Sequence, residues 1–195
     1  MLIRGIPAGP VGAGHMSDQQ WNFLEEVFLS NSLSAALGRS STYESPSSAN
    51  SEALGKVLRS ELCELVKEYA SPVPEEAHIQ NIAKLSHHVT GCCAPLLKAG
   101  CLRFGVAHKA LNLYLKFLWC AGRIPAPPHC PFDGKVIAEL HKLRKLPANL
   151  RDLSWTQMNE ATYRELVSAA KERLKDEPLA KWELRNWPAT GCSET

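Results

Sequence analysis

The sequence lacks the features that would assign it to a membrane, secreted or β-rich class. No stretch approaches about eighteen consecutive apolar residues, so no membrane-spanning helix and no membrane partner are predicted. Residues 1–16 contain no continuous apolar core of the kind found in secretory signals. No useful length of the chain alternates apolar and polar residues, which disfavours β-sheet. The missing secretory segment and the odd total of seven cysteines predict a cytoplasmic protein with free thiols.

The sequence also lacks any Cys-x-x-Cys pair, the spacing typical of structural zinc sites. The seven cysteines also have no regular spacing. We therefore predict no metal site and no cofactor. The sequence alone leaves open whether a zinc ion is bound by members of one cysteine and histidine cluster, which consists of Cys92, Cys93, Cys101, His129 and Cys130.

The chain has 195 residues, of which 45% are hydrophobic and 22% charged, and this is enough to bury a sizeable core without a disulfide or metal. Residues 1–16 are rich in Gly and Pro and are predicted to be a flexible leader, with either Met1 or Met16 as the start. Residues 17–195 are predicted to form one helical domain. The serine-rich segment 39–51 is predicted to be a loop.

Apolar residues recur at helical spacing through most of the remaining chain. Prolines or glycines end several of these segments, as expected at helix boundaries. The fold is therefore predicted to be all-α, with about six to eight helices. The helices form either one unit or two lobes with a groove between them, the lobes being 52–146 and 17–38 plus 150–188, joined by the 39–51 loop. The clearest expected helices are 18–37, 54–70, 75–91, 104–121, 133–146, 163–174 and 178–184.

Charge is distributed unevenly along the chain. The segment from Lys98 to Lys145 carries a net charge of +7, whereas the whole chain carries +2, so the remainder sums to −5. A basic face suits a polyanion such as nucleic acid, because neutralised phosphates release counterions. The alternative is that several of these side chains only solvate helix surfaces.

One part of the basic segment combines a lysine and an aspartate in a suggestive arrangement. Gly105 precedes an apolar helix, where unpaired backbone N–H groups form an anion site. Lys109 lies in the first turn of that helix, where burial and the positive helix end favour a reactive neutral amine. Asp133 is expected to start the next helix. If the proline-rich connection between them folds back, both side chains face one groove.

This segment resembles the helix-hairpin-helix DNA glycosylase superfamily, whose motif runs Gly-Val-Gly-x-Lys-Thr-Ala-Asn and then, after an apolar helix, Val-Asp-Thr-His-Val. Gly105, Val106, Lys109 and Asn112 match the hairpin, and Asp133 matches the later aspartate. The resemblance covers residues 104–138. Two further segments, LNLYLKFLW and PPHCPFD, also resemble a separate bacterial family of unassigned function.

The superfamily resemblance implies a helical DNA glycosylase or abasic-site lyase with two lobes. Lys109 would attack C1′ of an extruded nucleotide and form a Schiff base, while Asp133 stabilises the sugar cation. DNA is favoured over RNA as the partner. The alternative is a non-catalytic helical module that binds nucleic acid or a protein partner. The residues expected to contact nucleic acid are Arg103, Gly105, Val106, Ala107, His108 and Lys135.

Overall fold

The computed structural model describes residues 16–38, 40–175 and 177–186. The expected leader therefore lies outside the described residues, apart from Met16. The described part contains eight α-helices and four short 3-10 turns, which confirms the all-α prediction. The α-helices are α1 (Asp18–Leu37), α2 (Ser48–Leu65), α3 (Glu75–Cys93), α4 (Phe104–Cys120), α5 (Gly134–Leu143), α6 (Ala148–Arg151), α7 (Glu160–Leu174) and α8 (Leu179–Arg185). The 3-10 turns are η1 (Val66–Ala70), η2 (Ala94–Leu96), η3 (Lys98–Gly100) and η4 (Trp155–Gln157).

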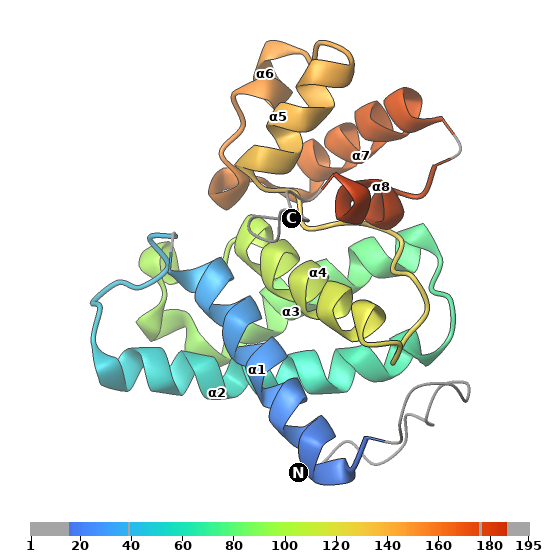
Figure 1. The fold of residues 1–195 in the computed structure, drawn as a ribbon. Helices are drawn as coiled ribbons and strands as arrows, with labels where there is room; N and C mark the ends of the chain where they lie inside the picture. Colours follow the sequence, from blue (N-terminus) through green and yellow to red (C-terminus); the bar gives the residue numbers. More distant parts are fainter. Residues whose placement is uncertain (1–15, 39, 176, 187–195) are drawn as a thin grey trace, which may run out of the picture.

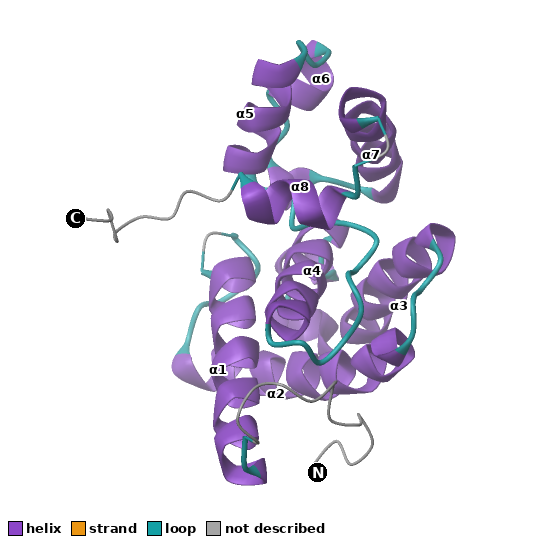
Figure 2. Cartoon of the chain, turned by 45° about the vertical axis from the view of Figure 1, so that its right-hand side comes forward, coloured by secondary structure: helices purple, strands orange, loops and turns teal. Residues whose placement is uncertain are grey.

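The helices form two groups, one above the other in Figures 1 and 2. The lower lobe consists of α1–α4, in which α1 and α3 both pack against α4. The upper lobe consists of α5–α8, in which α7 contacts α5, α6 and α8. The connection 121–133 runs from the far end of α4 back to the upper lobe, so α5 begins close to the start of α4.

Helix α4 lies at the centre of the lower lobe because its side chains are apolar almost all round. Leu111, Tyr114, Leu115 and Leu118 are fully or nearly fully buried. On its α1 side, the Phe117 ring stacks on Phe28, with ring centres 5.3 Å apart. The prediction that residues 104–121 form a buried core helix is confirmed.

Short polar side chains set the starts of several helices. Ser17 and Gln20 form a reciprocal capping box at the start of α1. Ser47 caps α2 by accepting a hydrogen bond from the Asn50 N–H. Asn159 accepts from the Thr162 N–H at the start of α7. Each cap satisfies backbone donors that the helix itself leaves without partners.

The segment expected to join two lobes has a different role. Residues 48–51 belong to α2, because Ser47 is the N-cap, and the loop before it is pinned inside the lower lobe. Glu44 N–H donates to the Leu96 carbonyl, and Lys98 N–H donates to the Thr42 carbonyl. The joint between the lobes is the 121–133 connection instead. Residues 17–38 do not share a lobe with residues 150–188 as expected, because α1 packs against α4 in the lower lobe.

Candidate functional site

Lys109 and Asp133 meet where the two lobes face each other. The Lys109 Nζ donates to Asp133 Oδ2 at 2.8 Å, and the two side chains are only 8% and 19% exposed. The other carboxylate oxygen, Oδ1, accepts from the N–H groups of Lys135 and Val136 and caps α5. The expected convergence of this lysine and this aspartate is therefore present.

Two neighbouring residues explain why this pair forms although 24 residues separate its members. The Phe132 side chain is fully buried, and its backbone N–H donates to His108 Nε2 at 3.0 Å. His108 immediately precedes Lys109 on α4, and its Nδ1 lies 3.1 Å from the Gly105 carbonyl oxygen. The residue before Asp133 is thus fastened to the residue before Lys109, and this aligns the two charged groups.

The electrostatics of Asp133 favour its ionised form. Burial by itself raises the pKa of this carboxyl group, but Lys109 and the two backbone donors lower it further than burial raises it. The net pKa lies below the ordinary value for aspartate. Asp133 is therefore a carboxylate at neutral pH and serves as the counter-ion of the Lys109 ammonium group.

The ion pair lines a groove of about 730 Å³. Leu113 and Pro131 provide apolar walls, and Lys135 adds an exposed cation. Trp155, from η4 in the upper lobe, closes one side, with its ring centre 5.9 Å from Lys109 Nζ. A groove of this size, with one aromatic wall and a few polar groups, falls within the range of small-ligand sites.

The expected anion site at the start of α4 is closed, which corrects the sequence prediction. The Gly105 N–H donates to the Met158 carbonyl at 2.9 Å, so it is not available to a phosphate. Val106, Ala107 and His108 are buried. An added Cβ at Gly105 would lie 1.9 Å from the Trp155 carbonyl oxygen. The glycine is needed for the close approach of η4, not for contact with a ligand.

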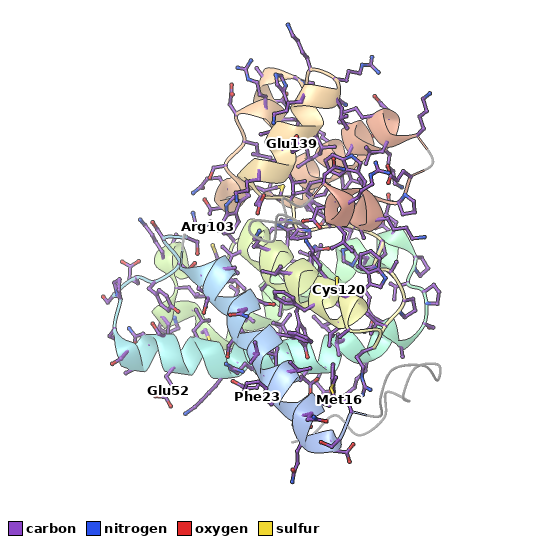
Figure 3. All side chains as sticks on the ribbon, in the orientation of Figure 1. Met16, Phe23, Glu52, Arg103, Cys120 and Glu139 are labelled. Atoms are coloured by element: carbon purple, nitrogen blue, oxygen red, sulfur yellow. The ribbon has the colours of Figure 1, made fainter. Side chains whose placement is uncertain are left out.

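The basic residues between Lys98 and Lys145 do not form one continuous face. Lys109 and Lys116 are buried, and each pairs with a carboxylate. The Arg123 guanidinium lies 4.1 Å from the centre of the Trp21 ring, in the lower lobe. Arg103, which donates to the Ser41 carbonyl, lies at the opposite end of α4 from Cys120 (Figure 3).

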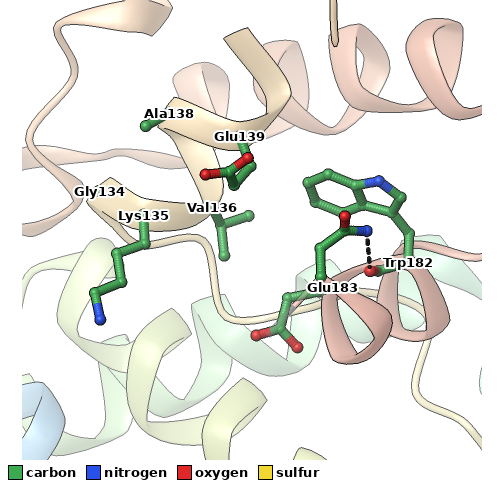
Figure 4. Close-up of a pocket in the computed structure, with 8 residues that line it drawn as sticks. Gly134, Lys135, Val136, Ala138, Glu139, Trp182 and Glu183 are labelled. Carbon is green, nitrogen blue, oxygen red and sulfur yellow. Dashed lines mark hydrogen bonds between the residues drawn. The ribbon is translucent and has the colours of Figure 1, made fainter. Parts of the chain in front are cut away.

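A second buried ion pair, not predicted from the sequence, involves Lys116, which lies about two turns after Lys109 on the same face of α4. Lys116 Nζ donates to Glu183 Oε1 at 2.7 Å, and these side chains are 10% and 2% exposed. Burial raises the pKa of Glu183 more than Lys116 lowers it. Glu183 and Trp182 also line a groove of about 440 Å³ between α5 and α8 (Figure 4). This groove and the Lys109 groove share Gly134 and Lys135.

A buried polar network, also not predicted from the sequence, joins α7 of the upper lobe to α3 of the lower lobe through His129. The Tyr163 hydroxyl, from α7, lies 2.8 Å from His129 Nδ1, and His129 Nε2 lies 3.3 Å from a Glu75 carboxylate oxygen on α3. The His78 ring lies edge-on to His129 at 4.9 Å between ring centres. Burial is the main cause that lowers the pKa of both histidines. These rings are therefore neutral at pH 7.

The remaining sequence candidates are placed as follows. Among the described residues, no three His, Cys, Asp or Glu side chains are arranged to hold a metal ion. Cys130 is buried, whereas Cys92 is exposed beside His88. Cys192 lies outside the described residues. None of the described helices has the length and apolar character needed to cross a bilayer.

Comparison with known proteins gives no relative. No protein-family model matches the sequence, and no curated protein or solved structure matches it either. The resemblance of residues 104–138 to the helix-hairpin-helix glycosylases therefore stays a prediction.

Proposed function

We propose that the protein is a nucleic-acid enzyme, a lyase or glycosylase that forms an imine through Lys109 with Asp133 as its electrostatic partner. The observation that carries this proposal is the 2.8 Å Lys109–Asp133 pair at the wall of the interlobe groove. Lysine amines form imines with aldehydes, and an abasic nucleotide exposes an aldehyde at C1′. DNA is the proposed substrate.

The reaction on an abasic site requires the neutral amine of Lys109. After the ammonium loses a proton to solvent, the nitrogen lone pair forms a bond to C1′ as the C1′–O π bond breaks. A proton then passes from the nitrogen to that oxygen, which gives a carbinolamine. Loss of water gives the imine. Transfer of a C2′ proton to solvent then forms the C2′–C3′ double bond as the C3′–O bond breaks, and the phosphate leaves with the electron pair. Because its pKa is lowered, Asp133 is a weak proton acceptor, so its role is to stabilise the developing positive charge.

A base-bearing nucleotide would react by a related step. The amine forms its bond to C1′ as the glycosidic bond breaks, and the base leaves with the bonding electrons and takes up the proton that the nitrogen loses. The nitrogen lone pair then forms the imine as the C1′–O4′ bond breaks, and O4′ takes up a proton from solvent. A base turned out of a duplex needs a stacking surface, which the half-buried Trp155 ring offers beside Lys109. The exposed Lys135 lies in the same groove, where it suits a phosphate group.

Borohydride trapping tests this proposal directly. The wild-type protein is incubated with duplexes that carry an abasic site, 8-oxoguanine or uracil, and the imine is reduced to a stable adduct. Lys109→Arg keeps the positive charge but removes the primary amine, so we expect no adduct. Lys84→Arg makes the same change at an exposed lysine of α3 outside the groove and should leave the adduct yield unchanged. Asp133→Asn keeps an N-cap residue but removes the charge, so we expect slower adduct formation.

The structure also favours a second candidate, because Asp133 caps α5 while it pairs with Lys109. In that case the pair only fastens the lobes together, and the protein is a non-catalytic binding module. The trapping assay separates the two functions. An adduct that persists in Lys109→Arg would refute Lys109 as the nucleophile. No adduct on any duplex, while salt-dependent DNA binding remains, would refute the imine-forming enzyme.

A further inference from the structure

The distal end of α5 carries an exposed basic segment, which we call the basic loop (Lys142, Arg144 and Lys145). All three residues are exposed. Lys142 pairs with Glu139 on the same helix. Within the described residues, the side chains of Arg144 and Lys145 have neither a hydrogen bond nor an ion pair. The loop therefore presents two uncompensated cations to solvent.

Hydrogen bonds to two neighbouring side chains, Arg173 and His141, hold the backbone of the basic loop and of the residue after it. Arg173, on α7, donates from Nε to the Arg144 carbonyl at 3.0 Å and from Nη2 to the Lys145 carbonyl at 2.8 Å. The Leu146 N–H, just after the loop, donates to His141 Nδ1 at 2.9 Å. A like charge placed beneath a basic loop raises the local positive potential. The loop is thus a fixed cationic surface, not a solvated tail.

Its distance from the candidate site suits a nucleic-acid backbone. Helix α5 begins after Asp133 and reaches the basic loop after ten residues. At 1.5 Å per residue this is about 15 Å, which is close to the rise of about four base pairs. A duplex with one nucleotide in the Lys109 groove would therefore have phosphates within reach of the loop.

We propose that the basic loop is a phosphate-contacting surface for duplex DNA, which anchors the strand that enters the Lys109 groove. This inference rests on the proposed function for its choice of partner. Contacts between these cations and phosphate groups do not distinguish one base from another, so the proposed binding does not depend on the DNA sequence. It replaces the buried start of α4 as the surface that holds the nucleic-acid backbone.

The salt dependence of binding tests this surface. Affinity for a fluorescent duplex is measured by anisotropy over a series of salt concentrations, with the wild type and Arg144→Ser/Lys145→Ser. Loss of two phosphate contacts should reduce the slope of log affinity against log salt by about 1.8. The matched control is Lys67→Ser/Lys84→Ser, which removes two exposed cations of the lower lobe and should leave the slope near that of the wild type.

A third variant tests whether the loop must be held in place. Arg173→Lys keeps the positive charge but cannot bridge both carbonyl groups, so we expect weaker binding with the wild-type slope. An unchanged slope in the Arg144/Lys145 double variant, or an equal change in the control pair, would overturn the proposal, and an acidic protein would then be the better partner. Binding requires no covalent step. A trapped adduct with an unchanged slope therefore refutes only this surface, and a reduced slope without an adduct refutes only the chemistry.

Discussion

Gly105 offers the sharpest test of how the upper lobe is seated on α4. Its backbone lies so close to η4 that an added Cβ would be 1.9 Å from the Trp155 carbonyl oxygen and 3.3 Å from the Met158 nitrogen. The nearest atom belongs to the backbone, so no side-chain rotation can relieve the overlap. Gly105→Ala must therefore push η4 away from α4, and the hydrogen bond from Gly105 N–H to the Met158 carbonyl is strained or lost.

The expected cost combines two opposing effects. Overpacking at a closed contact costs about 1–3 kcal/mol, and the lost hydrogen bond adds about 1 kcal/mol. Alanine is the better helix former by up to about 1 kcal/mol, which offsets part of this. We expect Gly105→Ala to lower the free energy of unfolding by about 2 kcal/mol. Gly55→Ala, in the middle of α2, meets no atom within 4 Å and should raise it by about 0.5–1 kcal/mol.

Equilibrium unfolding in urea measures both changes as shifts in the denaturation midpoint at a constant m-value. The same two variants are then compared in the trapping assay. Because Gly105→Ala displaces Trp155, which lines the groove, its adduct yield should also fall, whereas that of Gly55→Ala should not. If Gly105→Ala were as stable as Gly55→Ala, the close approach of η4 to α4 would be wrong, and Trp155 would not be a fixed wall of the groove.

Two further predictions concern buried charge. Burial lowers the pKa of His108 from about 6.5 to about 3, so its contribution to the free energy of unfolding is fully present above about pH 6.5 and decreases as the pH falls. Between pH 7 and pH 5 the loss should be about 2 kcal/mol. Urea unfolding at these two pH values that shows no decrease would contradict this prediction. Lys116→Met should lower the free energy of unfolding by about 3 kcal/mol, because Glu183 is left buried without its cation. Lys116→Met/Glu183→Gln should recover much of this loss in the same measurement. A double variant no more stable than the single one would show that the ion pair is not the cause.

Much of the fold follows from short-range patterns. The apolar residues of α4 and the prolines and caps around the other helices lie close together in sequence, so the helices can be predicted within a few residues. The meeting of Lys109 and Asp133 was predicted only on the condition that the proline-rich connection folds back along α4. The contact that fastens this return, from the Phe132 N–H to His108, joins residues far apart in sequence and is not part of any local pattern.

The closed start of α4 and the buried Glu183 could not be predicted in this way. The Gly105 N–H donates to the Met158 carbonyl, and the buried Glu183 carboxylate accepts from Lys116, so each outcome depends on a residue far away in sequence. The helix expected over residues 178–184 is present as α8. The structure buries Trp182 beside Glu183 and leaves Leu184 39% exposed. By residue type a glutamate is expected to be exposed, and Glu183 is buried because α8 packs against α4, where Lys116 is its partner.

The two lysine–carboxylate pairs on α4 show how lobe packing and the proposed chemistry are linked. Lys109 and Lys116 are seven residues apart, so they project from one face of α4. Their partners, Asp133 and Glu183, both come from the upper lobe, and both pairs therefore help to seat it. Asp133 is 19% exposed, whereas Glu183 is 2% exposed. The Asp133 pair is the more exposed of the two, so under the proposed chemistry it is the pair that would exchange its partner for a substrate, while the buried Glu183 pair would hold α4 against α8.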